Sequence, residues 1–136
     1  MQSQLGHIQF NVQPPNLPFY RELFAALGWQ TLYDVEGMLA VADPRGISLW
    51  FVGHVKAVDN DYDGPGVNHL GISVTAQADV DIAAAYLNGR GVPLLFETPR
   101  HRAEFAQSPE STYYQVMFET PDRILLEVVY IGLKSV

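Results

Sequence analysis

Two histidines occupy matching places in two similar segments of the chain, GHIQFNV and NHLGISV. Both segments alternate apolar and polar residues, as half-buried strands do, and His7 and His69 lie on the polar faces. A single histidine on a strand is usually a hydrogen-bonded surface or core residue. Two histidines at equivalent positions converge, however, if the segments pack about a pseudo-twofold axis, and neutral imidazole is the commonest metal ligand. The pair therefore predicts a metal site.

Glu127 is unusual because it lies inside the otherwise apolar run ILLEVVY. A carboxylate in a buried strand is costly unless it is paired or binds a metal ion. The alternatives are that Glu127 faces solvent on an edge strand, or that it pairs with Arg123. Together with the histidines it makes a set of two imidazoles and one carboxylate, which leaves coordination positions open for substrate, water or oxygen. We predict that His7, His69 and Glu127 are the metal ligands.

Further polar side chains share the strand faces of these residues. If Glu127 faces inward, alternation turns inward either the set Tyr113, Gln115 and Met117 or the set Tyr114, Val116 and Phe118; the first set suits a polar pocket better. The candidate substrate contacts, with a hydrated strand face as the alternative, are Gln9, Asn11, Ser73, Tyr113 and Gln115. The segment PRHR at 99–102 gathers basic side chains on an expected loop, which is either solvated or closes over an anionic substrate.

The elements that must position these residues form the same pattern twice, β-α-β-β-β. The first copy is expected as strand Leu5–Val12, a helix Leu17–Leu27 with Asn16 as N-cap and Gly28 at its end, and strands Trp29–Val35, Met38–Ala42 and Ile47–Val52. The second is expected as strand Val67–Val74, helix Ala78–Asn88, and strands Pro93–Glu97, Thr112–Phe118 and Ile124–Tyr130, with an irregular segment at 98–109. An internal repeat predicts an α+β fold of two tandem βαβββ modules. The alternative is two unrelated β-rich stretches that begin alike.

The polar stretch DNDYDGPG at 59–66 divides the chain almost in half. It is too short for a disordered linker and contains a tyrosine, so it is interpreted as a connector within one domain. The predicted organisation is a single domain over 1–136, with module one at about 5–53, a connector at about 54–65 and module two at about 66–133. His54, at a strand end, is given no role.

Composition excludes several classes of function. The 136 residues carry 8 Lys and Arg against 15 Asp and Glu, a net charge of −7, which disfavours nucleic acid as a partner. The chain has no cysteine, which removes disulfides, thiolate nucleophiles and cysteine-ligated metals. No apolar run approaches the length of a membrane span, and the N-terminus lacks the pattern of a signal peptide. We therefore expect a cytoplasmic domain that contacts neither membranes nor nucleic acid.

The doubled pattern, the strand openings with His7 and His69, and the run PDRILLE ending at Glu127 resemble the vicinal oxygen chelate superfamily. This group includes glyoxalase I, fosfomycin-resistance enzymes, extradiol dioxygenases and bleomycin-resistance proteins. The resemblance covers essentially the whole chain. It implies the glyoxalase/bleomycin resistance/dioxygenase-like fold, in which the modules form a curled mixed sheet whose concave face holds the metal.

The chain departs from each branch of this superfamily. Glyoxalase I enzymes usually carry a glutamate in the last strand of both modules, but this chain has Trp50 in the first, so a glyoxalase base is missing. Fosfomycin-resistance enzymes share the length, the ligand types and this tryptophan, but carry a threonine where this chain has Gln9. Extradiol dioxygenases rely on a further histidine and on a tyrosine, and this chain has Met117 at the position expected for that tyrosine. Trp50 is expected to wall off one coordination position and to stack against substrate.

Three functions remain open. The first is a divalent-metal-dependent enzyme of the dioxygenase, lyase/isomerase or epoxide-opening transferase type, in which Fe, Mn, Zn or Ni chelates two oxygens of a small-molecule substrate. The second is a metal-free, drug-sequestering protein of the bleomycin-resistance kind. The third is an interaction module with vestigial histidines. Many single-chain members of the superfamily share their metal sites across a dimer, so the resemblance also implies a homodimer.

Overall fold

The structure is a computed structural model that describes residues 1–53 and 56–135. The chain divides into two compact units, Met1–Asp59 and Asn60–Val136, and each is described by itself. His54 and the start of the expected connector lie outside the described residues. That the two units form a single domain stays a prediction.

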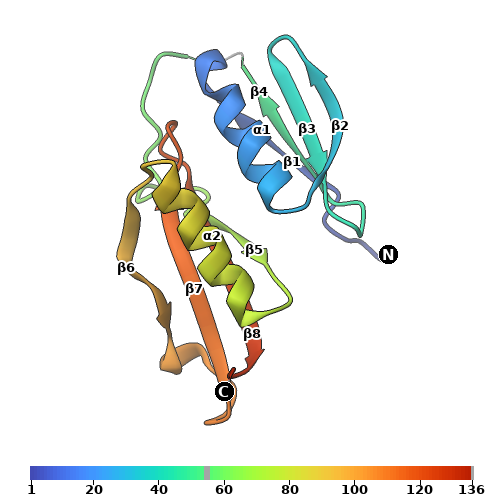
Figure 1. The fold of residues 1–136 in the computed structure, drawn as a ribbon. Coiled ribbons are helices and arrows are strands. Elements are labelled where there is room, and N and C mark those ends of the chain that lie inside the picture. The colour runs from blue at the N-terminus through green and yellow to red at the C-terminus, as the bar shows by residue number, and fades with distance from the viewer. Residues whose placement is uncertain (54–55, 136) are drawn as a thin grey trace. The chain divides into compact units, whose positions relative to one another are not determined.

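The first unit is a four-stranded sheet covered on one face by a helix (Figure 1). Its elements are β1 (His7–Asn11), the short helix η1 (Pro14–Asn16), α1 (Leu17–Ala26), β2 (Gln30–Val35), β3 (Met38–Ala42) and β4 (Ser48–Val52). The strand order is β1-β4-β3-β2, with β1 parallel to β4 and the other pairs antiparallel. Asn16 makes no side-chain cap, because η1 runs directly into α1 and leaves Asn16 in a helical conformation.

Aromatic packing holds α1 on this sheet. The ring of Phe51 on β4 stacks on Tyr20 of α1 with centroids 4.4 Å apart, and it lies 5.4 Å from the rings of both Phe10 and Phe24. Tyr20, Phe24 and Phe51 are almost fully buried. Strand alternation therefore turns Phe10 toward the helix and leaves His7 and its polar neighbours on the open face.

The second unit repeats the arrangement. Its elements are β5 (His69–Ser73), α2 (Gln77–Gly89), β6 (Leu94–His101), the short helix η2 (Ala103–Phe105), β7 (Ser111–Glu119) and β8 (Leu125–Leu133). The strand order is β5-β8-β7-β6, again with one parallel pair, β5 with β8. The predicted α+β fold of two βαβββ modules is confirmed.

The longest deviation from the expected elements is β6. It continues to His101 instead of ending at Glu97, so the first four residues of the segment expected to be irregular are strand. The register between β6 and β7 shifts between Leu95 and Arg100 and then resumes. A sequence pattern of period two cannot anticipate a strand that is interrupted and continues on the far side of a bulge.

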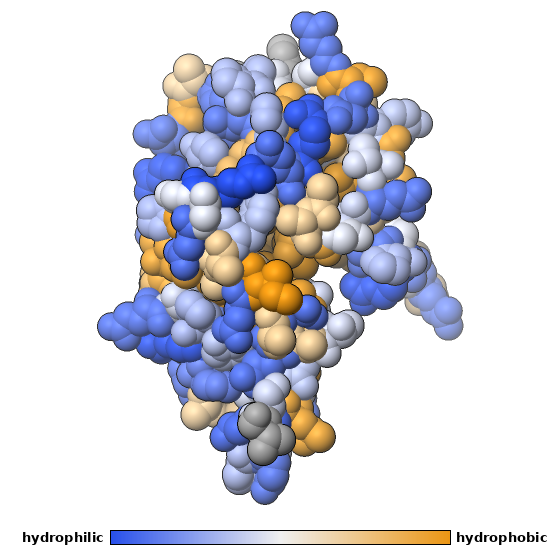
Figure 2. Space-filling view, viewed as in Figure 1, coloured by the Kyte–Doolittle hydropathy of each residue, from blue (hydrophilic) through white to orange (hydrophobic). Residues whose placement is uncertain are grey.

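The surface shown in Figure 2 is mostly hydrophilic, with apolar residues visible among the polar ones. In the first unit the edge strand β2 is exposed along its whole length, including Leu32, Tyr33 and Val35. Within residues 1–53 and 56–135, no helix has the length and apolar character needed to cross a membrane.

A tyrosine on the helix side of β7 predicts an alkaline loss of stability. Burial, followed by the hydrogen bond to Asp81 on α2, raises the pKa of Tyr114 to about 12 from 10.0. The folded chain holds this proton more tightly than the unfolded chain. The contribution of the Tyr114 hydroxyl to stability is therefore complete below the unfolded pKa of 10.0 and is lost as pH rises through the folded pKa of about 12. Between pH 10 and about pH 12, the free energy of unfolding measured in urea should fall less for Tyr114→Phe than for wild type. Tyr33→Phe on β2 is the control and should follow wild type; equal slopes for Tyr114→Phe and wild type would contradict the assignment.

Candidate metal and substrate site

The parallel pairing of β5 with β8 brings His69 and Glu127 together. Gly71 pairs with Glu127, so His69 lies one step diagonally from the carboxylate on the same face of the sheet. His69 Nε2 is 3.6 Å from Glu127 Oε2. Gly71 has no side chain, and a Cβ there would already lie 3.6 Å from Glu127 Oε1, so the glycine leaves the carboxylate uncovered on this side.

Glu127 is buried, with 3% of its surface exposed, on a strand inside the sheet. Both of its oxygens accept hydrogen bonds: Oε1 from the Tyr113 hydroxyl and Oε2 from the Gln115 amide, each at 2.6 Å. Neutral donors thus replace part of the water that the carboxylate loses. Burial first, and then the bond to Glu127, raise the pKa of Tyr113 to about 12, so near neutral pH this hydroxyl is a donor. Exposure on an edge strand is thereby excluded for Glu127.

Gln115 is itself held in one orientation by Arg102. The Arg102 guanidinium donates from Nη1 to Gln115 Oε1 at 3.1 Å, and a guanidinium can only donate. The amide nitrogen of Gln115 must therefore face Glu127. Arg102 also donates from Nε to Glu104 at 2.6 Å, which fixes its own side chain. Sequence reasoning missed this role because it placed Arg102 on a loop that is either solvated or closes over an anionic substrate.

His69 is oriented by the residue before it. Asn68 donates from its amide nitrogen to the Tyr62 carbonyl at 2.9 Å, so its amide oxygen faces His69 Nδ1, 2.8 Å away. Nδ1 must then carry the hydrogen, and neutral His69 presents a lone pair at Nε2. Histidines that bind metals show this arrangement, in which one ring nitrogen donates to an oxygen and the other binds the ion. Sequence reasoning also missed Asn68, although it stands directly beside His69.

This geometry fits a divalent metal. When His69 is neutral, its Nε2 and Glu127 Oε2 are two acceptors that face each other, and a cation between them would bind both; when His69 is protonated, the same atoms form an ion pair. Two ligands of one ion, each about 2.0–2.2 Å from it, stand roughly 3.0–3.6 Å apart. Within the described parts of the chain, no group of three histidine or carboxylate side chains is gathered that could hold an ion. The second unit therefore brings together two of the three predicted ligands, His69 and Glu127.

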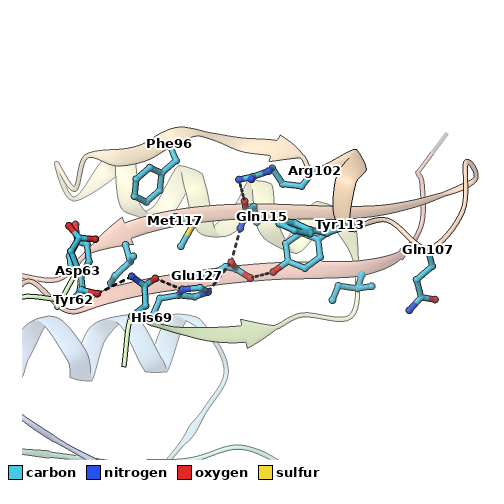
Figure 3. Close-up of a pocket in the computed structure, with 14 residues that line it drawn as sticks. Tyr62, Asp63, His69, Phe96, Arg102, Gln107, Tyr113, Gln115, Met117 and Glu127 are labelled. Carbon is cyan, nitrogen blue, oxygen red and sulfur yellow. Dashed lines mark hydrogen bonds and ion pairs between the residues drawn. The ribbon is translucent and has the colours of Figure 1, made fainter. Parts of the chain in front are cut away.

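The same two residues lie in a pocket of the second unit with a volume of about 560 Å³ (Figure 3). It is lined by Tyr62, Asp63, Asn68, His69, Phe96, Arg102, Phe105, Gln107, Tyr113, Gln115, Met117, Leu125, Glu127 and Ile131. Figure 3 shows Phe96 and Arg102 on the β6 side of the pocket, and His69 and Glu127 on the side of β5 and β8. The volume is that of a site for a small organic molecule.

The structure places the other predicted residues as follows. Tyr113 and Gln115 contact Glu127, whereas Tyr114, from the alternative set, turns to Asp81 on α2. Ser73 is exposed at the end of β5 and does not line the pocket. The segment 99–102 contributes one pocket residue, Arg102, and the other members of PRHR do not line it.

The remaining candidates belong to the first unit. His7, Gln9 and Asn11 are exposed on one face of β1, where the Gln9 amide donates to Asn11 Oδ1 at 3.1 Å. Gln9 pairs with Trp50 as Gly71 pairs with Glu127, so the tryptophan does take the place of a second glutamate. The Trp50 indole donates to Ser48 Oγ at 3.0 Å. Its predicted stacking on substrate stays a prediction.

Comparison with known proteins gives structural relatives only. No protein-family model and no curated protein matches the chain. A protein from Bacillus halodurans provisionally identified as a glyoxalase is 26% identical, with a TM-score of 0.78 over 95% of this chain and 96% of its own. A glyoxylase/bleomycin resistance protein/dioxygenase domain from Frankia is 22% identical, with a TM-score of 0.67 over 97% and 94%. The chain has the vicinal oxygen chelate fold.

A third protein with this fold was solved in complex with a metal. The fosfomycin resistance protein FosX from Listeria monocytogenes, in complex with Mn(II) and sulfate, has a TM-score of 0.69 and 19% identity, and the match covers 98% of this chain and 94% of FosX. At that identity the likeness concerns the fold. The resemblance to the vicinal oxygen chelate superfamily stated from the sequence is confirmed.

The bonds to Glu127 predict a specific cost for changing Gln115. Gln115→Leu removes the donor to Oε2 and leaves Arg102 Nη1 without its acceptor, so we expect a loss of about 1–3 kcal/mol in the free energy of unfolding. Gln115→Glu should lose more near neutral pH, because it sets a second carboxylate against the first. Gln107→Leu, at an exposed position lining the same pocket, is the control in urea unfolding. Wild-type stability for both Gln115 variants would show that this network does not hold the carboxylate.

Proposed function

We propose that this protein is a divalent-metal-dependent enzyme of the vicinal oxygen chelate type, acting on a small molecule that offers two oxygens to the metal. The observation that carries the proposal is the pair His69 Nε2 and Glu127 Oε2, two atoms of types that bind metals, 3.6 Å apart at a pocket of about 560 Å³. The presence of Mn(II) in FosX, a protein of the same fold, supports a divalent ion, with Fe, Zn and Ni as the other candidates.

His7 is the proposed third ligand. It pairs with Ser48 at the start of β1 as His69 pairs with Leu125 at the start of β5, so the two histidines are equivalent in the repeat. His7 is exposed on the open face of its sheet and is accessible to a partner group. The donor set would then be two imidazoles and one carboxylate, which leaves positions for a chelating substrate.

In this proposal the metal supplies Lewis-acid stabilisation of negative charge that develops on the chelated oxygens. The chain's own residues orient the site. Asn68 keeps the lone pair of His69 Nε2 directed at the pocket, and Tyr113 and Gln115 hold the Glu127 carboxylate. Trp50 offers no base where a second glutamate would stand, which favours dioxygenase, lyase or epoxide-opening chemistry over the glyoxalase reaction.

A metal-free binding protein of the bleomycin-resistance kind is the second candidate. The apolar members of the pocket lining, among them Phe96, Phe105 and Met117, favour it as a site for an organic ligand. The net charge of −7 would suit a cationic drug. Metal binding by the purified protein separates the two candidates.

The ligand assignment predicts the metal content of variants. His7→Ala, His69→Ala and Glu127→Ala should each lower metal content and Mn²⁺ affinity by about tenfold or more, since each removes one inner ligand. The measurements are elemental analysis of protein purified without chelators and a Mn²⁺ titration. His101→Ala, a strand histidine that does not line the pocket, is the control and should match wild type. Full metal occupancy in Glu127→Ala would rule the assignment out.

We further propose a homodimer in which His7 of one chain joins His69 and Glu127 of the other. Mixing His7→Ala subunits with Glu127→Ala subunits, each metal-poor alone, should restore about one metal per mixed dimer, because an isologous arrangement leaves one complete site. Mixed dimers are identified by mass spectrometry. If mixed dimers form and their metal content stays near zero, the shared site is wrong.

A further inference from the structure

Three large apolar side chains of the pocket lining remain exposed. Phe96 is 52% exposed, Phe105 55% and Ile131 51%. Single exposed apolar residues are ordinary, but here three of them line one pocket that also contains a histidine and a buried carboxylate. Their common position indicates a surface that an organic ligand covers.

Phe96 is directed to the pocket by an unusual backbone. Phe96 and Glu97 have φ values of 57° and 60°, a left-handed conformation that costs about 1–3 kcal/mol for residues other than glycine. This pair lies in the interruption of the register between β6 and β7. Without the interruption, β6 would continue its regular alternation past Phe96.

Thr98 holds this conformation in place. Its side chain is buried, donates to the Leu95 carbonyl at 2.7 Å and accepts from the Met117 amide at 2.9 Å. These bonds close the bulge across Phe96 and Glu97 and tie it to β7. The strain is therefore maintained by specific contacts, and its effect is to place an aromatic ring on the β6 side of the pocket that Met117 also lines (Figure 3).

Phe105 is also fixed. Its ring packs edge-on against Tyr113 with centroids 5.3 Å apart, and the Arg102 guanidinium lies 5.2 Å from its centroid. Tyr113 and Arg102 are both members of the network that holds Glu127. The ring thus has a defined position relative to the proposed metal ligand.

We propose that Phe96 and Phe105, which we call the aromatic clamp, determine specificity by binding a flat aromatic ring of the substrate. This rests on the proposed function insofar as it takes this pocket as the substrate site. Aromatic faces and edges attract a planar π-system beyond simple apolar burial, and the polarisable sulfur of Met117 adds to this preference. An aliphatic body of equal size would gain only the burial.

The test compares two alcohols with the same carbon skeleton, one flat and aromatic and the other saturated. 2-Naphthol and decahydro-2-naphthol are titrated into the full chain in the presence of EDTA, and binding is followed by amide chemical shifts. We expect 2-naphthol to bind about three- to tenfold more tightly, with shifts at Phe96, Phe105 and Tyr113. Phe96→Leu and Phe105→Leu should remove most of this difference, and Phe19→Leu, on α1 of the first unit, should leave it unchanged.

Several results would overturn the clamp. They are equal affinity for the two alcohols, a preference for 2-naphthol that survives in both leucine variants, or a change in oligomeric state in those variants that shows the rings to cover a second copy of the chain. A Mn²⁺ titration of the same samples separates this proposal from the metal site. If wild type binds no Mn²⁺ but prefers 2-naphthol, the proposed function alone is overturned. If wild type binds Mn²⁺ but shows no preference between the two alcohols, the clamp alone is overturned.

Discussion

The buried carboxylate of Glu127 is the constraint on which the second unit depends. A carboxyl group with 3% exposure needs hydrogen-bond donors to replace the water that it loses. Tyr113 and Gln115 supply two of these contacts directly, and Arg102 acts on the carboxylate through Gln115. Because Arg102 follows β6, the conformation of the chain there is coupled to the orientation of a side chain on β8. Structure and site are therefore maintained by one hydrogen-bond network.

The repeat shows how one backbone arrangement gives two different faces. In the second unit the row across the sheet is Gly71, Glu127 and Met117; in the first unit the equivalent row is Gln9, Trp50 and Ala40. A carboxylate beside a glycine leaves an open acceptor. An indole beside a glutamine fills the same space and hydrogen-bonds within its own strand. The first unit thus keeps the fold, and a histidine, but lacks the carboxylate.

The strands, both helices and the inward set at Tyr113 and Gln115 could be predicted because each follows a short-range period that burial enforces. Glu127 could be singled out because a charge in an apolar run requires a partner. The bulge at Phe96 could not be found in this way. It depends on bonds from Thr98 to β7, and neither phenylalanine nor glutamate gives a local signal for a left-handed backbone. Asn68 and Arg102 were missed for the same reason, since their roles depend on tertiary partners.

The regular and the irregular pairings of the second sheet lie in different strands. β8 is paired on both sides, and β5 pairs with it in an uninterrupted register, so His69 and Glu127 are set by regular ladders. β6 is an edge strand with one neighbour, so an interruption there disturbs only the pairing with β7. An edge bulge can therefore change the aromatic contacts of the pocket without moving His69 and Glu127. This separation would let the fold keep the proposed metal ligands in place while the side chains proposed to select the substrate differ.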